Sequence, residues 1–289
     1  MNSYIDIHSH FLPGFDDGPE NFDQCIETAR RYRALGIGTI IATPHWIRST
    51  GWVPSPAKIL RAAKKVEFDL ELAGVPLKII PGMEIGYSSY FKQDMSQYRL
   101  LPLGLSEYFL VEFPLYMPAE DLVKHFMSLL TGKNMKIIVA HPERCAVFQN
   151  NTCLLQRLVN KGILVQVTID SLLGVFGIKI QETALDFLNS GLVHFLATDS
   201  HGRGGRMPPD IDCWNMLVDL LGNEGVTQAC SENPRQMLEG KPVEPLSANV
   251  AGSGSSLSEL FSEKTNDNSK FNNDSGLLKK LINTLKKNM

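Results

Sequence analysis

Several features are scarce or missing in this sequence of 289 residues. It has five cysteines, an odd number, and no Cys-x-x-Cys pair, which argues against a disulfide framework and against a thiolate zinc site. No stretch approaches the roughly 18 uninterrupted apolar residues of a membrane span, and the N-terminus lacks the basic and apolar segments of an export signal. We therefore expect reduced thiols and a cytoplasmic location.

An excess of charge of either sign is also missing. Lysine and arginine number 28 against 31 aspartates and glutamates, a formal net charge of −3, so no global field gathers nucleic acid. We expect no nucleic-acid partner, and any binding of anions must come from a local site. A hydrophobic content of 43% and a length near 300 residues are typical of a globular protein with one large domain and a tail.

Short apolar or β-branched runs recur through the first 200 residues and predict seven strands. They lie at 4–7, 38–43, 77–84, 108–113, 136–141, 163–168 and 194–198. Segments with the helical spacing of apolar residues lie between most of these runs. Strands that alternate with helices predict an α/β fold with parallel strands and crossover helices.

The composition changes near residue 245. We expect residues 1–245 to form the folded domain and 246–275, rich in Ser, Asn and Gly, to form a flexible linker. Residues 276–289 place leucines and an isoleucine on one face and lysines elsewhere, which predicts a short basic amphipathic helix. That helix either docks on its own domain or makes a weak contact with a protein partner or with the inner surface of the membrane.

Most of the chemistry-bearing residues follow predicted strands. Five of the seven histidines and four carboxylates are placed in this way: His8, His10, Asp17, His45, Glu84, Glu112, His141, Asp199 and His201. In a parallel barrel these positions share the carboxyl-terminal rim, where active sites are built. The other two histidines, His125 and His194, lie elsewhere on their elements and receive no role.

A rim so rich in carboxylates and imidazoles needs positive charge, because clustered carboxylates repel one another. His8 and His10 alternate along an extended segment and can chelate one ion, and the two oxygens of Glu84 can bridge two ions. Each residue alone has an ordinary explanation, such as an Asx turn at Asp17. The whole set predicts a metal centre with nitrogen and oxygen ligands, which suits zinc, manganese or iron.

Cys25 and Arg31 have the spacing of the thiol tyrosine phosphatases, but we reject that mechanism. It requires a glycine-rich loop at a helix N-terminus, whereas this segment lies inside a helical pattern and contains no glycine.

Several motifs together resemble a known family. They are DIHSHFLPGFDDGP (6–19), ATPHW (42–46), PGMEI (81–85), LVEFP (110–114), AHPER (140–144), QVTIDSLLGVFG (166–177), ATDSHGRGGRMPP (197–209) and ENPRQMLEG (232–240). In this order they resemble the capsule-biosynthesis (CpsB-like) protein tyrosine phosphatases of the PHP superfamily, over about residues 1–245.

The resemblance implies a distorted (β/α)7 TIM-like barrel of the PHP type and three divalent metal ions, with manganese expected and iron or zinc as alternatives. By the same resemblance the ligand sets are His8, His10, Glu84 and Asp199 for the first ion, Glu84, Glu112 and His141 for the second, and Asp17, His45 and His201 for the third. Arg144 and Arg206 match the family's arginines, which bind the phosphate and stabilise the transition state.

The function implied is a metal-dependent phosphotyrosine-protein phosphatase that uses metal-activated hydroxide. Its expected substrate is the tail of a bacterial tyrosine autokinase, and its expected role is to regulate capsule or exopolysaccharide synthesis. Three divalent ions outweigh four carboxylates, so the site attracts a phosphoester dianion although the protein is negative overall. The alternatives are another PHP phosphoesterase, acting on histidinol phosphate or a nucleotide, and a non-catalytic assembly regulator.

Overall fold

The structure is a computed structural model that describes residues 3–116, 126–127 and 136–247. The expected helix around residues 122–130, with His125, lies almost wholly outside the described residues. So do nearly all of the expected linker and the whole of the expected terminal helix.

Parallel strands form the centre of the fold. They are β1 (Tyr4–Ser9), β2 (Ile37–Ala42), β3 (His45–Trp46), β4 (Lys78–Pro81), β5 (Glu84–Gly86), β6 (Tyr108–Glu112), β7 (Lys136–Ala140), β8 (Leu164–Thr168) and β9 (Phe195–Ala197). They pair in two sheets, β1-β2-β4 and β3-β5-β6-β7-β8-β9, and every pairing is parallel. All seven predicted strands are confirmed, and the predicted α/β fold with parallel sheets is confirmed with them.

Two of the seven predicted runs meet a break in the structure. After β2 the chain bends at Thr43 and resumes pairing as β3, and between β4 and β5 it bends at Gly82. A Cβ on Gly82 would lie 2.8 Å from Ile41 Cγ2 and 2.9 Å from Leu103 Cδ2, so a larger residue would require these side chains to shift. The bends carry the chain from the first sheet into the second and place the start of β3 and of β5 at the rim.

The ring of strands closes between β1 and β9. Ser9 and Ser200 form a parallel bridge, the His10 amide donates to the Ser200 carbonyl at 2.8 Å, and the Asp199 amide donates to the His8 carbonyl at 3.0 Å. These bonds come from the loop after β9 rather than from the strand itself. We call this junction the seam of the barrel.

A β-bulge interrupts β1. Asp6 pairs with Ile40 and Ser9 with Ala42, so β1 uses three steps where β2 uses two. An extra residue of this kind re-aims side chains, and bulges are frequent beside active sites. Ile7 packs in the apolar barrel core while His8 and His10 also turn inward, as their contacts below show.

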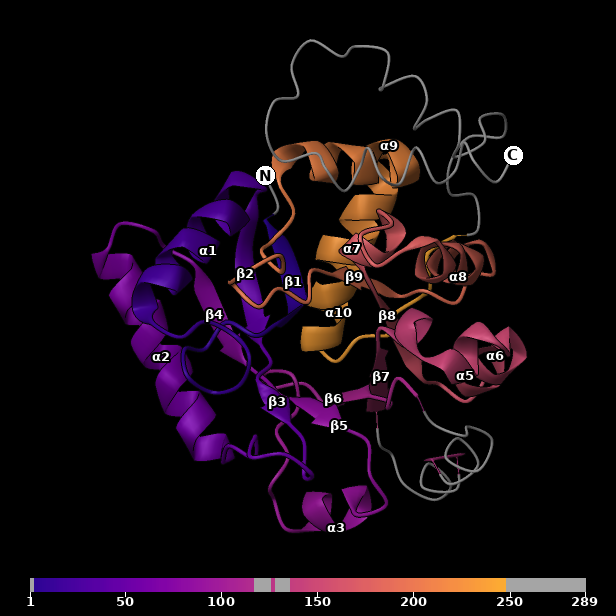
Figure 1. Cartoon of the computed structure of the whole chain (residues 1–289), viewed down its shortest axis with the longest axis horizontal. Helices are drawn as coiled ribbons and strands as arrows, with labels where there is room; N and C mark the ends of the chain where they lie inside the picture. Colours follow the sequence, from indigo (N-terminus) through magenta and orange to yellow (C-terminus); the bar gives the residue numbers. More distant parts are fainter. Residues whose placement is uncertain (1–2, 117–125, 128–135, 248–289) are drawn as a thin grey trace. The chain divides into compact units, whose positions relative to one another are not determined.

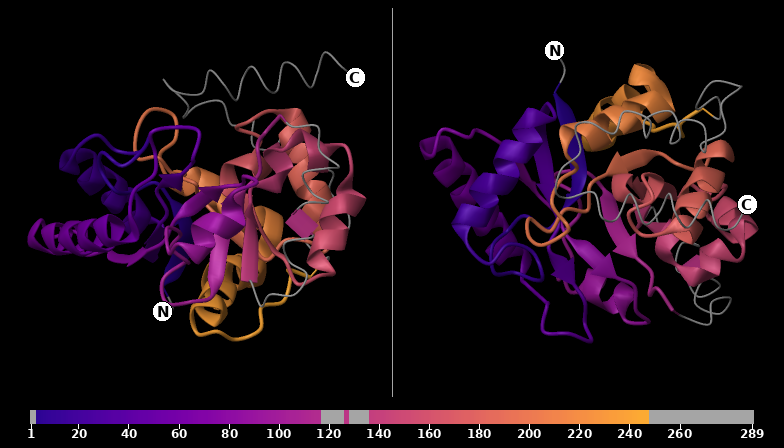
Figure 2. Two further views of the ribbon diagram at one scale, coloured as in Figure 1. Left: turned by 90° about the horizontal axis from the view of Figure 1, so that it is seen from below. Right: turned by 45° about the horizontal axis from the view of Figure 1, so that its top comes forward.

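Helices cover the outside of the strands. They are α1 (Phe22–Ala34), α2 (Pro56–Leu72), α3 (Phe91–Ser96), α5 (Ala146–Gln149), α6 (Thr152–Val159), α7 (Ile169–Leu172), α8 (Ile178–Asn189), α9 (Ile211–Thr227) and α10 (Asn233–Leu238). Figure 1 shows α1 and α2 beside β1, β2 and β4, with α5, α6 and α8 beyond β7 and β8. Figure 2 shows from two more directions that the strands lie between these two groups of helices.

The strand interior is apolar below the rim. Ile7, Ile41, Leu110, Ile138 and Phe195 come from different strands and pack in one core cluster. Burial of such side chains supplies the main drive for folding, at about 25 cal/mol per Å². The rim residues therefore lie directly above a close-packed apolar core.

The ordered packing extends one residue past the expected end of the domain. Leu246 is buried and its amide donates to the Val193 carbonyl at 2.8 Å, beside the start of β9. Within the described part of the chain, no helix combines the length and the apolar character that crossing a membrane requires.

Candidate metal centre

The structure brings all nine predicted rim residues together. His8, His10 and Asp17 come from the end of β1 and the loop after it, His45 and Glu84 begin β3 and β5, Glu112 ends β6, and His141, Asp199 and His201 follow β7 and β9. Three overlapping groups of these side chains have ligand atoms close enough together to hold an ion.

The first group, which we call the tetrahedral group, has five distances between ligand atoms that match those of a tetrahedral site. His8 Nε2 lies 3.2 Å from His10 Nε2 and from Glu84 Oε2, and 3.3 Å from Asp199 Oδ1. His10 Nε2 lies 3.1 Å from the same glutamate oxygen and 3.3 Å from the same aspartate oxygen. Ligand atoms about 2.0–2.1 Å from a tetrahedral ion lie about 3.3–3.4 Å apart, so these four side chains fit one ion.

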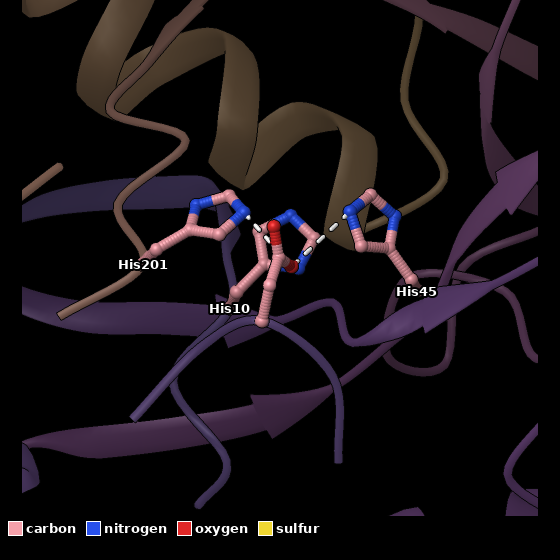
Figure 3. A group of neighbouring side chains, drawn as sticks. His10, His45 and His201 are labelled. Carbon is pink, nitrogen blue, oxygen red and sulfur yellow. Dashed lines mark ion pairs between the residues drawn. The ribbon is translucent and has the colours of Figure 1, made fainter. Parts of the chain in front are cut away.

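The second group gathers around Asp17. Its Oδ1 atom lies 3.2 Å from His201 Nε2 and 3.5 Å from His45 Nε2. Figure 3 shows that His10, His45 and His201 point toward one another, with ion pairs from His45 and His201 to a carboxylate between them. The ring of His10 stacks on that of His201, with centroids 4.0 Å apart.

The third group contains two glutamates. Nδ1 of His45 lies 3.0 Å from Glu84 Oε2 and 3.6 Å from Glu112 Oε1. His141, expected beside these glutamates, contacts one of them: its Nε2 atom lies 2.8 Å from Glu84 Oε1. The group within mutual ligand range therefore contains His45, and His141 joins it through Glu84.

Buried polar atoms that lack a hydrogen bond are concentrated among the same side chains. Burying a polar atom without a partner costs free energy, so such atoms in a folded protein need an explanation. Six buried atoms of the rim side chains have no hydrogen-bond partner within the described ranges of the chain: Asp17 Oδ1, His45 Nδ1, Glu84 Oε2, His141 Nδ1, Asp199 Oδ1 and His201 Nε2. Cations bound among them would satisfy these atoms, which is the observation that fits the residues to metal.

The charges at the rim are strongly coupled. Burial alone would lower the pKa of His8, but the carboxylates of Glu84 and Asp199 overcome it and raise that pKa above its usual value. Burial would raise the pKa of Glu84, and the nearby His8 and His45 more than offset it and hold it well below its usual range. The carboxylates thus favour positive charge in the space between them.

His201 differs from these histidines. Burial, together with the nearby His10, lowers its pKa to about 4. Its Nδ1 atom lies 3.0 Å from the Asp199 carbonyl, which leaves Nε2 toward Asp17. His201 is therefore neutral near pH 7, the form in which imidazole binds a metal.

Both predicted arginines lie at the rim and share one carboxylate oxygen. Arg144 Nη1 donates to Asp199 Oδ2 at 2.7 Å, and Arg206 Nη2 donates to the same oxygen at 2.9 Å. The guanidinium of Arg144 lies over the ring of Phe176, 4.2 Å from its centroid, while its Nε and Nη2 atoms are buried and form no hydrogen bond with any residue that the structure describes. These two N–H groups lie in the plane of the guanidinium, a geometry that suits hydrogen bonds to the oxygens of a phosphate.

The loop after β9 holds Arg206 by its backbone. The carbonyl of Arg206 accepts hydrogen bonds from the amides of His201 at 2.8 Å and Gly202 at 3.2 Å, and from Ser200 Oγ at 3.2 Å. Gly202 has a φ of +61°, which favours glycine at this turn. These bonds fix the backbone of Arg206 beside His201, one of the predicted metal ligands.

Two rim residues carry unusual backbone angles. His141 has φ 31° and Asp199 has φ 50°, both in the left-handed region that non-glycine residues avoid. Such conformations persist where the surroundings enforce them and are concentrated at functional sites.

Sequence reasoning missed three polar residues near the site. Asp16 and Gln166 contact the outer nitrogens of His10 and His8, at 2.7 and 2.9 Å. Asp170 lies in the first turn of α7, where burial raises its pKa to about 6 although the nearby Arg144 lowers it. All three lie within motifs quoted above, Asp16 in DIHSHFLPGFDDGP and Gln166 and Asp170 in QVTIDSLLGVFG, but the sequence pattern gave none of them a role.

The thiol of Cys25 is remote from this chemistry. Cys25 is fully buried within α1 and its Sγ lies 3.4 Å from the carbonyls of Phe11 and Asn21. Burial raises the pKa of Cys25 to about 12, the opposite of what a nucleophilic cysteine needs. The rejection of a thiol mechanism agrees with this environment.

A parallel α/β barrel with histidines and carboxylates converging on its carboxyl-terminal rim defines the class of barrel hydrolases that use metal ions. The chain belongs to the family described as capsular polysaccharide synthesis, CpsB/CapC, which it matches over residues 4–239.

Relatives of known name and solved structures agree with this assignment. The tyrosine-protein phosphatase YwqE of Bacillus subtilis is 38% identical over 242 residues, covering 83% of this chain and 93% of that protein. The tyrosine-protein phosphatase CpsB of Streptococcus agalactiae is 26% identical, covering 81% and 98%.

A crystal structure from work on YwqE of Bacillus subtilis and CpsB of Streptococcus pneumoniae, described as unique metal-dependent tyrosine phosphatases, matches with a TM-score of 0.74. Its sequence is 33% identical, and the match covers 84% of this chain and 99% of that one. Histidinol phosphate phosphatase of Lactococcus lactis matches with a TM-score of 0.50 at 13% identity, covering 86% and 99%, and shares the fold.

Proposed function

We propose that this chain is a metal-dependent phosphotyrosine-protein phosphatase. The observation that carries the proposal is the tetrahedral group of His8, His10, Glu84 and Asp199 directly beside Arg144, whose Nε and Nη2 atoms have no hydrogen-bond partner among the described residues. A cation site next to unpaired arginine donors suits an anionic ester, and the relatives named above are tyrosine phosphatases.

The nine rim residues would hold three divalent ions, as the three groups of ligand atoms suggest. Manganese is our expected metal, with iron or zinc as alternatives, since mixed imidazole and carboxylate donors suit all three. Such ions would supply Lewis acidity and make a bound water acidic enough to act as a nucleophile near pH 7.

The arginines would bind the phosphoryl group. Arg144 and Arg206 donate to Asp199 in this structure, and Nε and Nη2 of Arg144 would donate to the equatorial oxygens of a phosphate, while Nη1 of Arg206 lies 3.6 Å from Asp17 Oδ2. Charge that develops on those oxygens in the transition state would be stabilised by donors already fixed in place. The phenolate of tyrosine, with a pKa near 10, leaves more readily than an alkoxide, so it makes less demand on a general acid.

We propose the tail of a bacterial tyrosine autokinase as the substrate protein, and regulation of capsule or exopolysaccharide synthesis as the role. The family description supports the connection to capsular polysaccharide. The proposed location is cytoplasmic, at the inner face of the membrane, where such a kinase would present its tail.

The basic segment at 276–289 is our proposed contact with that membrane surface, and it lies outside the described residues. Four lysines near an anionic surface contribute about 1 kcal/mol each, which gives weak and salt-sensitive attachment. Sedimentation with anionic vesicles at low salt should separate the full chain from a chain truncated after residue 249. Equal partitioning of the two would contradict the contact.

The activity is tested by comparing a phosphotyrosine peptide, a phosphoserine peptide and histidinol phosphate as substrates. The protein is first stripped with a chelator and then reloaded with manganese, iron or zinc in separate samples. We expect the phosphotyrosine peptide to be hydrolysed fastest and only after metal is returned.

Arg144→Lys provides a matched variant for the same assay. It keeps the positive charge but removes the guanidinium fork, so kcat/KM should fall by about tenfold to a hundredfold while metal content stays at the wild-type level. Preference for histidinol phosphate would favour another PHP phosphoesterase. Absence of turnover with every metal would favour a non-catalytic assembly regulator.

A further inference from the structure

The loop that contains the proposed ligand Asp17 also contains Asp16, whose carboxylate points toward the outer nitrogen of His10. The side chain of Asp16 is fully buried against His10. Its Oδ2 atom accepts from two groups at once, His10 Nδ1 at 2.7 Å and the backbone amide of His45 at 2.8 Å. Its Oδ1 atom accepts from the Gly18 amide at 3.0 Å, so Asp16 is the residue that forms the Asx turn expected at Asp17.

The bond to His10 selects which nitrogen of that ring is free. His10 Nε2 lies within 3.3 Å of oxygens of Glu84 and Asp199, inside the tetrahedral group. The acceptor at Nδ1 therefore places the proton on Nδ1 and leaves the Nε2 lone pair for an ion. A carboxylate in this position also makes the imidazole a stronger ligand and fixes the plane of its ring.

The bond to His45 positions a second ligand by its backbone. The His45 amide begins β3, directly after the bend at Thr43 and Pro44, where the strand pairing is interrupted. The ring of His45 also stacks in parallel on Trp52, with centroids 5.3 Å apart and planes 8° apart. With the amide held on one side and the ring on the other, His45 has little freedom to leave Asp17 and Glu84.

The glycine of the same motif allows this approach. A Cβ at Gly18 would collide with the carbonyl oxygen of His10, so a larger residue would push the loop away from β1. The three residues of the motif therefore have different roles. The side chain of Asp16 faces inward, the side chain of Asp17 is a proposed metal ligand, and Gly18 lets the loop lie against β1.

We infer that Asp16 is a positioning residue that couples two of the ion sites, because one of its oxygens orients His10 of the tetrahedral group and holds His45 of the group around Asp17. The inference rests on the proposed metal centre. It predicts that loss of Asp16 weakens binding at two positions together.

Gln166 provides a matched control. Its Oε1 atom lies 2.9 Å from His8 Nδ1, so it orients one ligand of one group, with a neutral amide. Like Asp16 it is buried, so its substitution disturbs the interior to a similar degree. A variant at Gln166 should therefore weaken one ion position.

The experiment compares wild type, Asp16→Asn, Asp16→Ala and Gln166→Ala as full chains. Manganese bound per chain is measured by elemental analysis at a series of fixed free concentrations, and the metal-free proteins are checked by thermal unfolding. Substitution of a residue that orients a ligand costs about tenfold to a hundredfold in affinity. We expect that loss for two ions in both Asp16 variants and for one ion in Gln166→Ala.

The visible absorption of bound cobalt gives a measurement that a change in loop stability alone would not alter. Asp16→Asn keeps the shape of the side chain and one acceptor oxygen, but it removes the charge that strengthens His10 as a ligand. The visible absorption of the cobalt-loaded variant should therefore shift relative to wild type. If Asp16→Ala fails to fold, the asparagine variant decides the question.

The outcomes distinguish a failure of the role inferred for Asp16 from a failure of the proposed metal centre. If wild type binds no metal, the proposed centre itself is wrong. If wild type binds metal and Asp16→Asn retains its affinity and cobalt spectrum, or loses affinity at a single position, the coupling through Asp16 is wrong.

Discussion

Asp6 and His8 lie two residues apart on β1, and both are buried, yet they belong to two different kinds of polar cluster. Asp6 faces α1, where the hydroxyl of Tyr32 donates to its Oδ2 atom at 2.9 Å. Thr198 donates to it through both its amide, at 3.1 Å, and its hydroxyl, at 2.5 Å. His8 faces the barrel interior, beside Glu84 Oε2 and Asp199 Oδ1, which have no hydrogen-bond partner in the part of the chain that the structure describes.

The difference lies in what completes each cluster. Burial raises the pKa of Asp6, but four hydrogen bonds to its carboxylate oppose that rise, so the protein itself satisfies the group. The cluster around His8 is left incomplete by the protein and needs cations from outside. A buried polar cluster that is complete contributes to folding, whereas one that is incomplete points to a ligand.

The largest effect that would sharpen this comparison is expected at Glu84, which contacts His8, His10, His45 and His141. Glu84→Gln removes the shared charge, so activity should fall at least about a thousandfold, more than the loss for a residue that only orients a ligand. Phosphatase assays and elemental analysis measure the effect. Thermal unfolding of the metal-free variant checks that it is folded, and near-normal activity would refute the metal assignment.

Asp6→Ala should show the opposite pattern. It leaves the amides of His8 and Thr198 without their acceptor, so the free energy of unfolding should fall by about 3 kcal/mol, since each orphaned group costs about 1–3 kcal/mol. Denaturant unfolding measures the loss. Manganese bound per folded chain should stay at the wild-type level, and loss of metal without loss of stability would erase the distinction between the two clusters.

His194 tests the comparison with a histidine away from the rim. Burial lowers its pKa to about 4, and its Nδ1 atom accepts from the Val165 amide at 3.1 Å. Because the unfolded chain takes up this proton near pH 6.5, stability is full above that pH and is lost as the pH falls toward 4. Between pH 6 and 5 the loss is about 1 kcal/mol.

In His194→Asn that component should disappear, because the amide oxygen can accept from Val165 and does not titrate. Denaturant unfolding at several pH values measures the slope for both proteins. An unchanged slope in the variant would show that His194 is not the group responsible.

The smallest effect is expected at Cys25. Cys25→Ser should leave activity within about twofold, because the buried thiol lies inside α1 and its raised pKa excludes a thiolate. Steady-state kinetics on an aryl phosphate measures it. A hundredfold loss with metal content intact would restore the thiol mechanism.

Much of the fold and the rim could be predicted from the sequence because the signals are local. Each strand is a short apolar run, and eight of the nine rim residues stand within four residues of a strand end, so parallel topology alone brings these eight to one rim; Asp17, eight residues past the end of β1, is the exception. For the residues beside strand ends, this prediction does not depend on the conformation of the loops.

The remaining features depend on pairing across the chain. Simple alternation along β1 would put His8 and His10 on the same face as Asp6, and only the bulge against β2 separates them. The pairing of Gln166 with His8 joins positions 158 residues apart. His45 lies between two groups of ligands because β2 breaks before it, and no local pattern predicts that break.

The seam between β1 and β9 has a consequence for the life of the protein in a cell. Its backbone bonds come from His8, His10 and Asp199, which are also three members of the tetrahedral group, so one ion there would join both sides of the seam. Whatever binds the native state and not the unfolded chain adds to its stability. We therefore expect a metal-starved cell to hold a more protease-sensitive enzyme, so that divalent metal supply sets its abundance as well as its activity.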